Sequence, residues 1–224
     1  FSTGFSKDIA MVSSNRIFRR SRLPRLLSGG LWSSAALFGL SLFVIAPSAS
    51  YAAGELQKAI DDASEFATVK LGPGLYEGNI VIRKPLTLVA TQPSAVIKGD
   101  GKGSVVTVES SYVTIEGLEI INSGGEHQTI DSGIAVKNGF NVKIKNNKIH
   151  ECLFGVNLEK SNNCVVEDNQ ISSKKLSLGL RGDGIRLWYS HSNLIIKNHT
   201  FQVRDNVFWY SSGNTVEKNI GRNS

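Results

Sequence analysis

An asparagine that returns at a regular interval is the feature that most constrains this fold. It occupies positions Asn147, Asn169, Asn198 and Asn219. The intervals are 22, 29 and 21 residues, and each asparagine lies three places after an apolar residue. Short alternating apolar stretches bounded by Asn, Gly and Ser surround each one, which is typical of strands and turns. Units this short cannot bury an apolar side alone, so successive copies must stack on one another.

We predict an all-β fold, a right-handed parallel β-helix with coils of about 22 residues. Ile134 and Val136 alternate with neighbours on the other face of the same strand, so one side of each coil should face a shared interior. The recurring asparagine should bond the turns above and below it and so satisfy buried backbone groups. One coil upstream, Leu118 takes the asparagine position. The last coil should be irregular, because Asn206 stands where Ile185 stands one coil earlier.

The chain divides into three predicted segments. Residues 1–10 precede Met11 and look like an upstream or fragment edge. Residues 11–52 read as a signal peptide, with a basic stretch, an apolar run shorter than a membrane span and small residues before a cleavage site after Ala52. A permanent anchor is the competing interpretation. The β-helix domain covers 53–224, and we expect it to be truncated at the C-terminus because the chain ends at a coil without a cap.

A helix is expected at the start of the β-helix domain. Residues 55–66 carry apolar side chains at helical spacing, and we predict that this segment caps the open end of the stack. The apolar positions are Leu56, Ala59, Ile60 and Ala63.

The excess of positive charge lies in the N-terminal segment that contains the predicted signal peptide, called the leader below. The formal net charge is +6, but residues 1–52 hold six of the 25 Lys and Arg and one of the 19 Asp and Glu. The remaining chain is almost neutral, with 19 basic and 18 acidic residues. A nucleic-acid partner is therefore not indicated.

Two coils carry extra residues at the same corner. The segments 122–132 and 172–183 are longer than the matching turn before Gly155, and they flank that short coil. Insertions at one corner of a solenoid often build a binding face, so these loops could wall a groove. The alternative is that they are solvent-exposed loops without a binding role.

The tripeptide Trp-Tyr-Ser occurs twice, 21 residues apart, and should stack in neighbouring coils. If Leu187 points inward, Trp188 points outward and forms an aromatic ridge with its counterpart. Such a ridge suits a partner interface or a sugar-binding surface, although aromatic stacks also simply stabilise solenoid faces. The partner-binding candidates are Arg181, Asp183, Arg186, Trp188, Tyr189, His191, Trp209 and Tyr210.

No catalytic residue or metal site is assigned from the sequence. Asp183 and Arg186 only weakly imitate the acid and cation clusters of polysaccharide lyases and epimerases. The histidines are scattered, and no methionine follows the leader to supply thioether ligands for Cu(I). Cys152 and Cys164 should pack as small apolar residues rather than form a disulfide.

The stretch 181–219, with its doubled Trp-Tyr-Ser after GDGIRL, resembles the NosD family, as does the segment from Leu71 to Gly124. These are periplasmic β-helix proteins that take part in maturing nitrous oxide reductase. The likeness covers about Glu55 to Asn219. Asn206 departs from the family pattern, and later coils of a full member are absent.

The resemblance implies a periplasmic accessory protein in denitrification rather than an enzyme. It implies partnership with ABC transporter subunits, with a lipoprotein copper chaperone and with nitrous oxide reductase, whose copper centres it helps assemble. Contact with the membrane would run only through those partners, and any copper ligands are unknown. The alternative, from architecture alone, is a carbohydrate-binding or polysaccharide-modifying β-helix protein.

Overall fold

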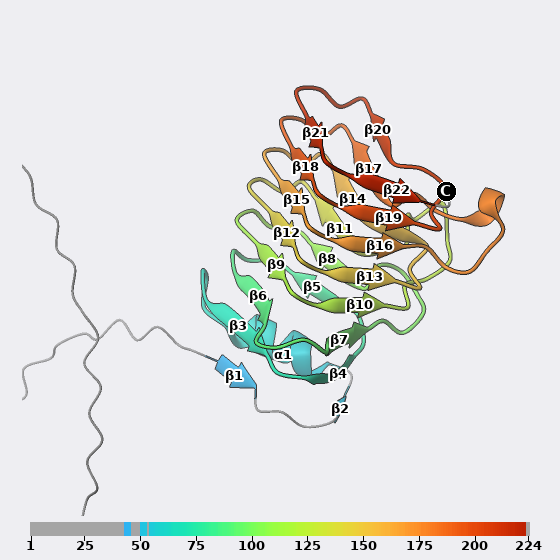
Figure 1. Ribbon diagram of the computed structural model, residues 1–224. Helices are drawn as coiled ribbons and strands as arrows, with labels where there is room; N and C mark the ends of the chain where they lie inside the picture. Colours follow the sequence, from blue (N-terminus) through green and yellow to red (C-terminus); the bar gives the residue numbers. More distant parts are fainter. Residues whose placement is uncertain (1–42, 46–49, 53, 223–224) are drawn as a thin grey trace, which may run out of the picture. The chain divides into compact units, whose positions relative to one another are not determined.

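The computed structural model describes residues 43–45, 50–52 and 54–222, and these wind into a stack of parallel coils (Figure 1). Each coil contributes short strands to three parallel sheets, which run along the stack. The predicted parallel β-helix is therefore confirmed. Residues 1–10 and most of the predicted signal peptide lie outside the described residues.

The three sheets have eight, eight and six strands, and each strand pairs with its equivalents in the neighbouring coils. The first sheet contains β1 (Phe43–Ile45), β3 (Thr68–Leu71), β6 (Thr87–Ala90), β9 (Thr114–Glu116), β12 (Lys143–Lys145), β15 (Val165–Glu167), β18 (Leu194–Ile196) and β21 (Thr215–Glu217). The second contains β2 (Ser50–Tyr51), β4 (Gly74–Glu77), β7 (Ala95–Lys98), β10 (Glu119–Ile121), β13 (Lys148–His150), β16 (Gln170–Ser172), β19 (His199–Phe201) and β22 (Ile220–Arg222). The third contains β5 (Ile80–Ile82), β8 (Val106–Val108), β11 (Ser132–Lys137), β14 (Phe154–Glu159), β17 (Ile185–Trp188) and β20 (Val207–Trp209).

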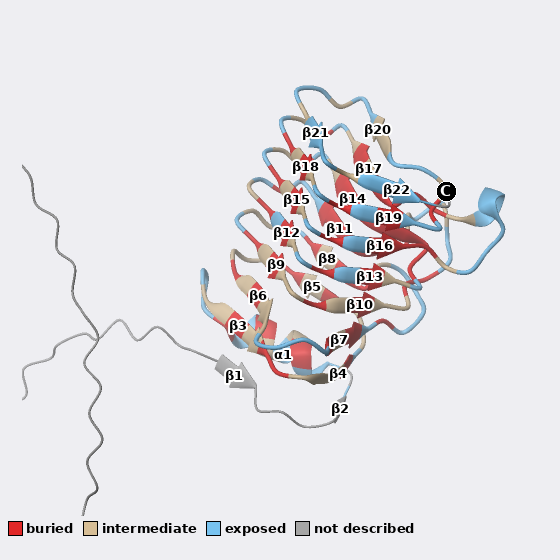
Figure 2. Cartoon of the chain, in the orientation of Figure 1, coloured by how far each residue is buried: buried red, intermediate tan, exposed pale blue. Residues whose placement is uncertain are grey.

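Aliphatic side chains fill the inside of the coils, and Figure 2 shows the buried positions recurring along the strands of successive coils. In the first sheet Ile115, Ile144, Val166 and Ile195 stack in register, and all are buried. Strands with period-two alternation can place one set of side chains inside at every coil. The apolar pattern of the sequence thus becomes one continuous core.

The asparagine ladder forms as predicted. Asn169 Oδ1 accepts the backbone N–H of Asn147 at 3.0 Å and its amide nitrogen at 3.1 Å, while Asn169 Nδ2 donates to Ile144 O at 2.9 Å. Asn198 repeats this arrangement one coil later. The ladder ends where the sequence predicted, because the N–H of Leu118 donates to Asn147 Oδ1.

Two further ladders at other turns were not predicted. Ser190 Oγ accepts the N–H of Ser161 and donates to Leu158 O, and Ser211 repeats the first of these contacts with the N–H of Ser190. Asn193 and Asn214 form a second asparagine stack. Ser and Asn are common in any turn, so their repetition gave no separate signal.

The N-terminal helix α1 (Glu55–Asp62) lies against the first strand of the third sheet. Its own side chains Leu56 and Ile60 are buried. The side chain of Gln57 accepts the N–H of Val81 at 2.7 Å and donates to its carbonyl oxygen at 3.0 Å, as a neighbouring strand would. The predicted cap is confirmed, and it protects an open sheet edge from pairing.

The last coil departs from the pattern at Asn206, as expected. β20 begins one residue after it, and Asn206 Oδ1 accepts the N–H of Ile185 at 2.9 Å. Its amide nitrogen donates to Thr200 Oγ1. A polar side chain therefore substitutes for one strand position through hydrogen bonds.

Candidate docking surface

The two Trp-Tyr-Ser tripeptides lie side by side at the ends of β17 and β20. Trp188 and Trp209 are direct partners in the parallel register. Leu187 is buried, so alternation turns Trp188 outward, and Trp209 is 54% exposed. Each following tyrosine has a positive φ, which bends the chain there and directs the next serine into the serine ladder.

We call Trp188, Tyr189, Trp209 and Tyr210 the aromatic ridge. The two tyrosine rings stack with centroids 4.8 Å apart and an interplanar angle of 10°. Trp188 meets Trp209 edge-on at 5.6 Å and Tyr210 at 5.1 Å. Pairs of this kind contribute about 0.5–1.5 kcal/mol beyond area burial, so the ridge is held in one arrangement.

Arg186 gives the aromatic ridge a fixed positive charge. Its guanidinium carbon lies 4.9 Å from the Trp188 ring centroid, and Nη1 donates to Asn157 Oδ1 at 2.9 Å. Burial lowers the pKa of the Arg186 guanidinium, and the nearby carboxylates of Asp183 and Glu159 oppose that shift. Arginine stays charged across the physiological range, so a planar cation stands beside the aromatic rings.

A shallow hollow of about 340 Å³ adjoins the ridge and is lined by Trp188, Phe208, Trp209 and Tyr210. Its walls are aromatic. Such a surface can receive an apolar side chain or the face of a sugar ring, and Arg186 can pair with a carboxylate beside it.

His191, another predicted candidate, follows the ridge on the next turn. Its Nδ1 accepts the N–H of Ser212 at 3.1 Å and lies 2.9 Å from Ser212 Oγ. These contacts orient the imidazole by bonding to the coil above. The ring is thereby fixed near the ridge and leaves its other nitrogen for solvent or a partner.

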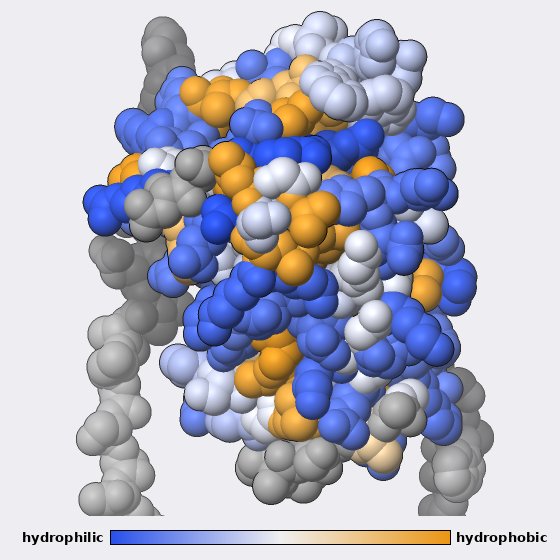
Figure 3. All heavy atoms as spheres, turned by 90° about the vertical axis from the view of Figure 1, so that its right-hand side faces the viewer, coloured by the Kyte–Doolittle hydropathy of each residue, from blue (hydrophilic) through white to orange (hydrophobic). Residues whose placement is uncertain are grey.

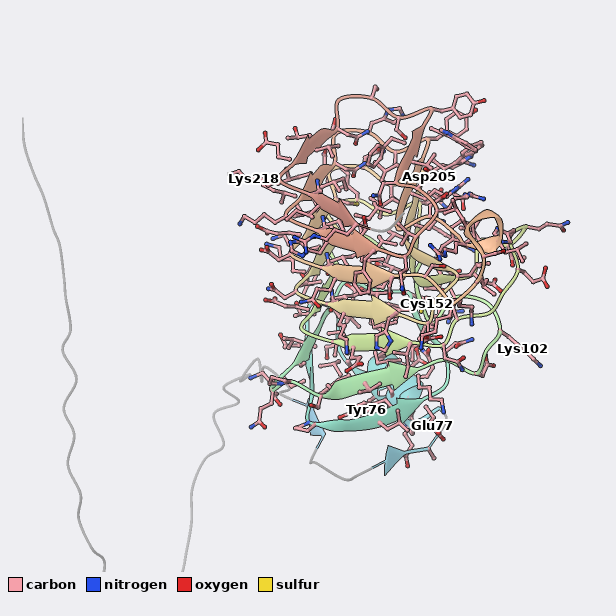
Figure 4. All side chains as sticks on the ribbon, turned by 45° about the vertical axis from the view of Figure 1, so that its right-hand side comes forward. Tyr76, Glu77, Lys102, Cys152, Asp205 and Lys218 are labelled. Carbon is pink, nitrogen blue, oxygen red and sulfur yellow. The ribbon has the colours of Figure 1, made fainter. Side chains whose placement is uncertain are left out.

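Asp183 and Arg181 lie at the opposite end of β17 from the ridge. Asp183 is only 2% exposed, and its Oδ1 accepts Nε of Arg204 at 3.1 Å and Nη2 at 2.9 Å. Burial raises the pKa of the Asp183 carboxyl, and Arg204 partly offsets the rise. Asp205, labelled in Figure 4, lies 3.8 Å from Arg204 Nε. Arg181 Nε donates to Leu176 O, within its own loop.

This geometry separates the eight predicted residues into two groups. Arg186, Trp188 and their aromatic neighbours form one surface, whereas Asp183 is a buried structural anion and Arg181 stabilises a loop. Arg204 and Asn157, which hold Asp183 and Arg186 in place, were not predicted from the sequence. Both partners are one coil away, so only the coil register pairs them.

The two long loops do leave the same corner, and they touch. His127 Nε2 donates to Leu180 O at 3.0 Å, and the His127 ring contacts Phe154 edge-on at 5.5 Å. The groove predicted between the loops is therefore bridged at this point. Asp131 is buried and bonds Thr129 and the N–H of Glu126, so it shapes the first loop.

No group of three or more potential metal-binding His, Cys, Asp or Glu side chains occurs within the described ranges. Cys152 and Cys164 are both free and buried, as predicted. Burial raises the pKa of each thiol to about 11. Figure 4 places Cys152 within the coil stack. Cys164 stands at the turn position that Asn193 takes in the next coil, and its N–H donates to Asn193 Oδ1.

The coils match known families over most of the described chain. Residues 94–201 match the family model described as "Right handed beta helix region", in agreement with the predicted hand. The chain is 33% identical over 137 residues to "Probable ABC transporter binding protein NosD" of Pseudomonas aeruginosa, covering 60% of this chain and 32% of that protein. The protein of the same name from Stutzerimonas stutzeri is 28% identical over 138 residues, covering 61% and 31%. The resemblance to the NosD family is thereby confirmed.

Solved structures share the fold. The crystal structure of alginate lyase from Paenibacillus sp. str. FPU-7 has a TM-score of 0.66 at 19% identity, covering 77% of this chain and 65% of that one. A putative glycosyl hydrolase from Parabacteroides merdae has a TM-score of 0.61 at 12% identity, covering 76% and 92%. At such identities the likeness concerns architecture and not activity.

The chain spans about a third of the length of the NosD relatives it matches. In the part of the chain that the structure describes, no helix has the length and apolar character needed to cross a membrane.

Proposed function

We propose that this chain is the β-helix part of a periplasmic accessory protein that works with an ABC transporter in assembling the copper centres of nitrous oxide reductase. The similarity to proteins named ABC transporter binding protein NosD supports this role. In this proposal copper is the cargo of the assembly pathway. The chain acts as a scaffold that brings protein partners together and is not itself an enzyme.

The aromatic ridge with Arg186 is the observation that carries the proposal. Trp, Tyr and Arg are the residues most enriched at the centres of protein interfaces. Here they are ordered before any partner arrives, because the tyrosines stack and Arg186 is bonded to Asn157. Preordering lowers the entropy lost on association, so this surface suits a docking site.

The test uses a denitrifying host that lacks the full-length gene. Nitrous oxide reductase would be purified from this host and assayed for activity and copper content, with the wild-type gene restored as reference. We expect the deletion to leave an inactive reductase deficient in copper. Fully metallated reductase in the deletion strain would refute the proposed role.

Variants then test the ridge itself. Trp188→Ala with Trp209→Ala, in the full-length gene, should fail to restore copper content and should lose co-purification with the transporter subunits. Phe66→Ala is the matched control, because Phe66 is an exposed aromatic residue 68% accessible and outside the ridge. If the ridge and control variants restored copper content equally, docking would not depend on the ridge.

A carbohydrate-binding role is the second candidate, favoured by the same rings. Exposed aromatic faces beside a guanidinium can stack on an acidic sugar and pair with its carboxylate. Titration with acidic glycans, followed by tryptophan fluorescence, distinguishes the two. Saturable binding that Trp209→Ala abolishes would favour this candidate, and an unchanged spectrum across the panel would exclude the ridge as a glycan site.

A further inference from the structure

The second corner loop exposes its three leucines to solvent. Leu178 and Leu180 are 51% and 58% exposed, and Leu176 is 36% exposed. They lie on and beside a single 3-10 turn, η1 (Leu178–Leu180), which stands off from the coil stack in Figure 1. Figure 3, which faces that side, shows hydrophobic surface bordered by hydrophilic surface. Exposed apolar groups gathered in one place usually mark an interaction site.

The loop is ordered by its own hydrogen bonds. The N–H of Leu180 donates to Ser177 O and that of Arg181 to Leu178 O. Arg181 Nε caps Leu176 O, and His127 reaches across from the first loop to Leu180 O. These backbone groups keep their partners if the loop tip leaves water, which lowers the penalty for entering an apolar medium.

Basic residues flank the leucines along the chain. Lys174, Lys175 and Arg181 flank them, and the segment 172–182 contains no acidic residue. Exposed leucines on a projecting turn, with basic residues on either side in the sequence, suit the surface of an anionic membrane. The apolar groups enter the acyl region while the cations stay among anionic headgroups.

The composition argues against a protein partner at this loop. Lys and Ser are depleted at protein interfaces, and Leu and Ser are under-represented among hot spots, whereas the aromatic ridge has the opposite composition. We infer that, in addition to any membrane contact through partners, the 172–182 loop is itself a peripheral membrane-binding element that inserts Leu178 and Leu180 into an anionic phospholipid surface.

The experiment must report on the loop alone, because residues 11–52 are themselves basic and apolar. An NBD fluorophore is attached through Ser177→Cys in the full chain. The two native thiols are buried, with a pKa raised to about 11, so they do not compete for the label. A second protein carries the label through Ser64→Cys, an exposed position near α1.

Both proteins are mixed with vesicles of phosphatidylglycerol and phosphatidylcholine, and with phosphatidylcholine alone. We expect the label at residue 177 to brighten and shift to the blue only with the anionic vesicles, and the label at residue 64 to stay unchanged. Leu178→Ser with Leu180→Ser should weaken the response by on the order of tenfold or more. Lys174→Gln with Lys175→Gln should weaken it by on the order of tenfold, with loss at high salt.

An unchanged signal at residue 177 on anionic vesicles would overturn the inference, even if the protein sedimented with them. If the leucine variants fail to support reductase maturation while vesicles leave the signal unchanged, the loop contacts a protein and the lipid assignment is wrong. Thermal unfolding of each variant is measured alongside, and it should match the wild type because these leucines are exposed.

Discussion

Asp183 and Arg204 form an ion pair across two consecutive coils, with Arg204 Nη2 2.9 Å from Asp183 Oδ1. The carboxylate is buried and the guanidinium is about one-third exposed. The pair lies where the long 172–183 loop rejoins the stack, so it fixes the point at which β17 begins.

Removal of the cation should strand a buried anion. We expect Arg204→Met to lower the free energy of unfolding by about 2 kcal/mol, less than for a fully buried pair because Arg204 is partly exposed. Burial raises the Asp183 pKa, and losing Arg204 raises it further. The folded variant therefore binds a proton more readily than the unfolded chain, and its stability should recover as the pH falls through the raised pKa of folded Asp183. Urea titrations at several pH values measure this, and a deficit independent of pH would contradict it.

The middle of the asparagine ladder should be more sensitive than its end. Asn169→Leu keeps the volume but removes the acceptor of two donors from Asn147, so it should cost about 2–4 kcal/mol. Asn219→Leu is the control, because Asn219 is itself only partly buried at that end of the stack, and it should cost less than half as much. Chemical denaturation of both variants provides the comparison, and equal losses would argue against the ladder as a stabilising element.

Glu119 should make the stability of the β-helix depend on pH in the acid range. Burial raises its pKa, but hydrogen bonds from His150 at 2.6 Å and Lys148 at 3.0 Å outweigh burial and leave the pKa below its ordinary value. A depressed pKa adds stability above the unfolded value, and this is lost as pH falls through the folded value. We expect this interaction to add about 1 kcal/mol to the free energy of unfolding near neutral pH, and this contribution should be absent in Glu119→Gln. Acid titrations of the wild type and variant should differ in stability near neutral pH and converge as the pH falls below about 5, and a difference independent of pH would disprove it.

The cysteines should be silent in the native protein. Both thiols are buried with a pKa near 11, so almost no thiolate forms at pH 8. Treatment with a thiol-reactive chromophore should therefore modify neither Cys152 nor Cys164 until denaturant is added, when both should react. Rapid labelling of one site in native buffer would show that its coil opens readily.

A substitution in the aromatic ridge should impair docking much more than it impairs folding. Trp209→Ala removes edge-on contacts, but the Trp209 side chain is already 54% exposed, so it should cost about 2 kcal/mol or less in unfolding free energy. Its effect on reductase maturation should be much larger than that. A variant that simply unfolds at growth temperature would remove the distinction, and thermal melting of the purified protein checks for this.

Much of the fold followed from local chemistry. Asn147 and Asn169 mark equivalent turns, and Ile144 and Val166 mark equivalent inward positions. They recur because each coil of a solenoid needs the same residue types at the same positions. The outward direction of Trp188 followed from strand alternation after Leu187 was placed inside. The pairing of Trp188 with Trp209 followed from the 21-residue spacing between the two tripeptides.

The partners across coils were harder to predict. Asp183 looked like a surface residue until the register placed it beside Arg204, and the bond from His127 to Leu180 spans 53 residues. Coil lengths vary with their loops, so no fixed spacing identifies such neighbours. Leu178 and Leu180 show the same limit, since their apolar character alone would favour burial.

By itself, the sequence determined the parallel β-helix, the asparagine ladder, the capping helix and the position of the aromatic ridge, because each depends on a pattern repeated at short range. Only the tertiary structure decided that Asp183 is buried, that Arg186 is held by Asn157 and that the 172–182 loop exposes its leucines. The physical reason is that burial and charge pairing depend on the coil above and below. That relationship exists only after the loops have set the register.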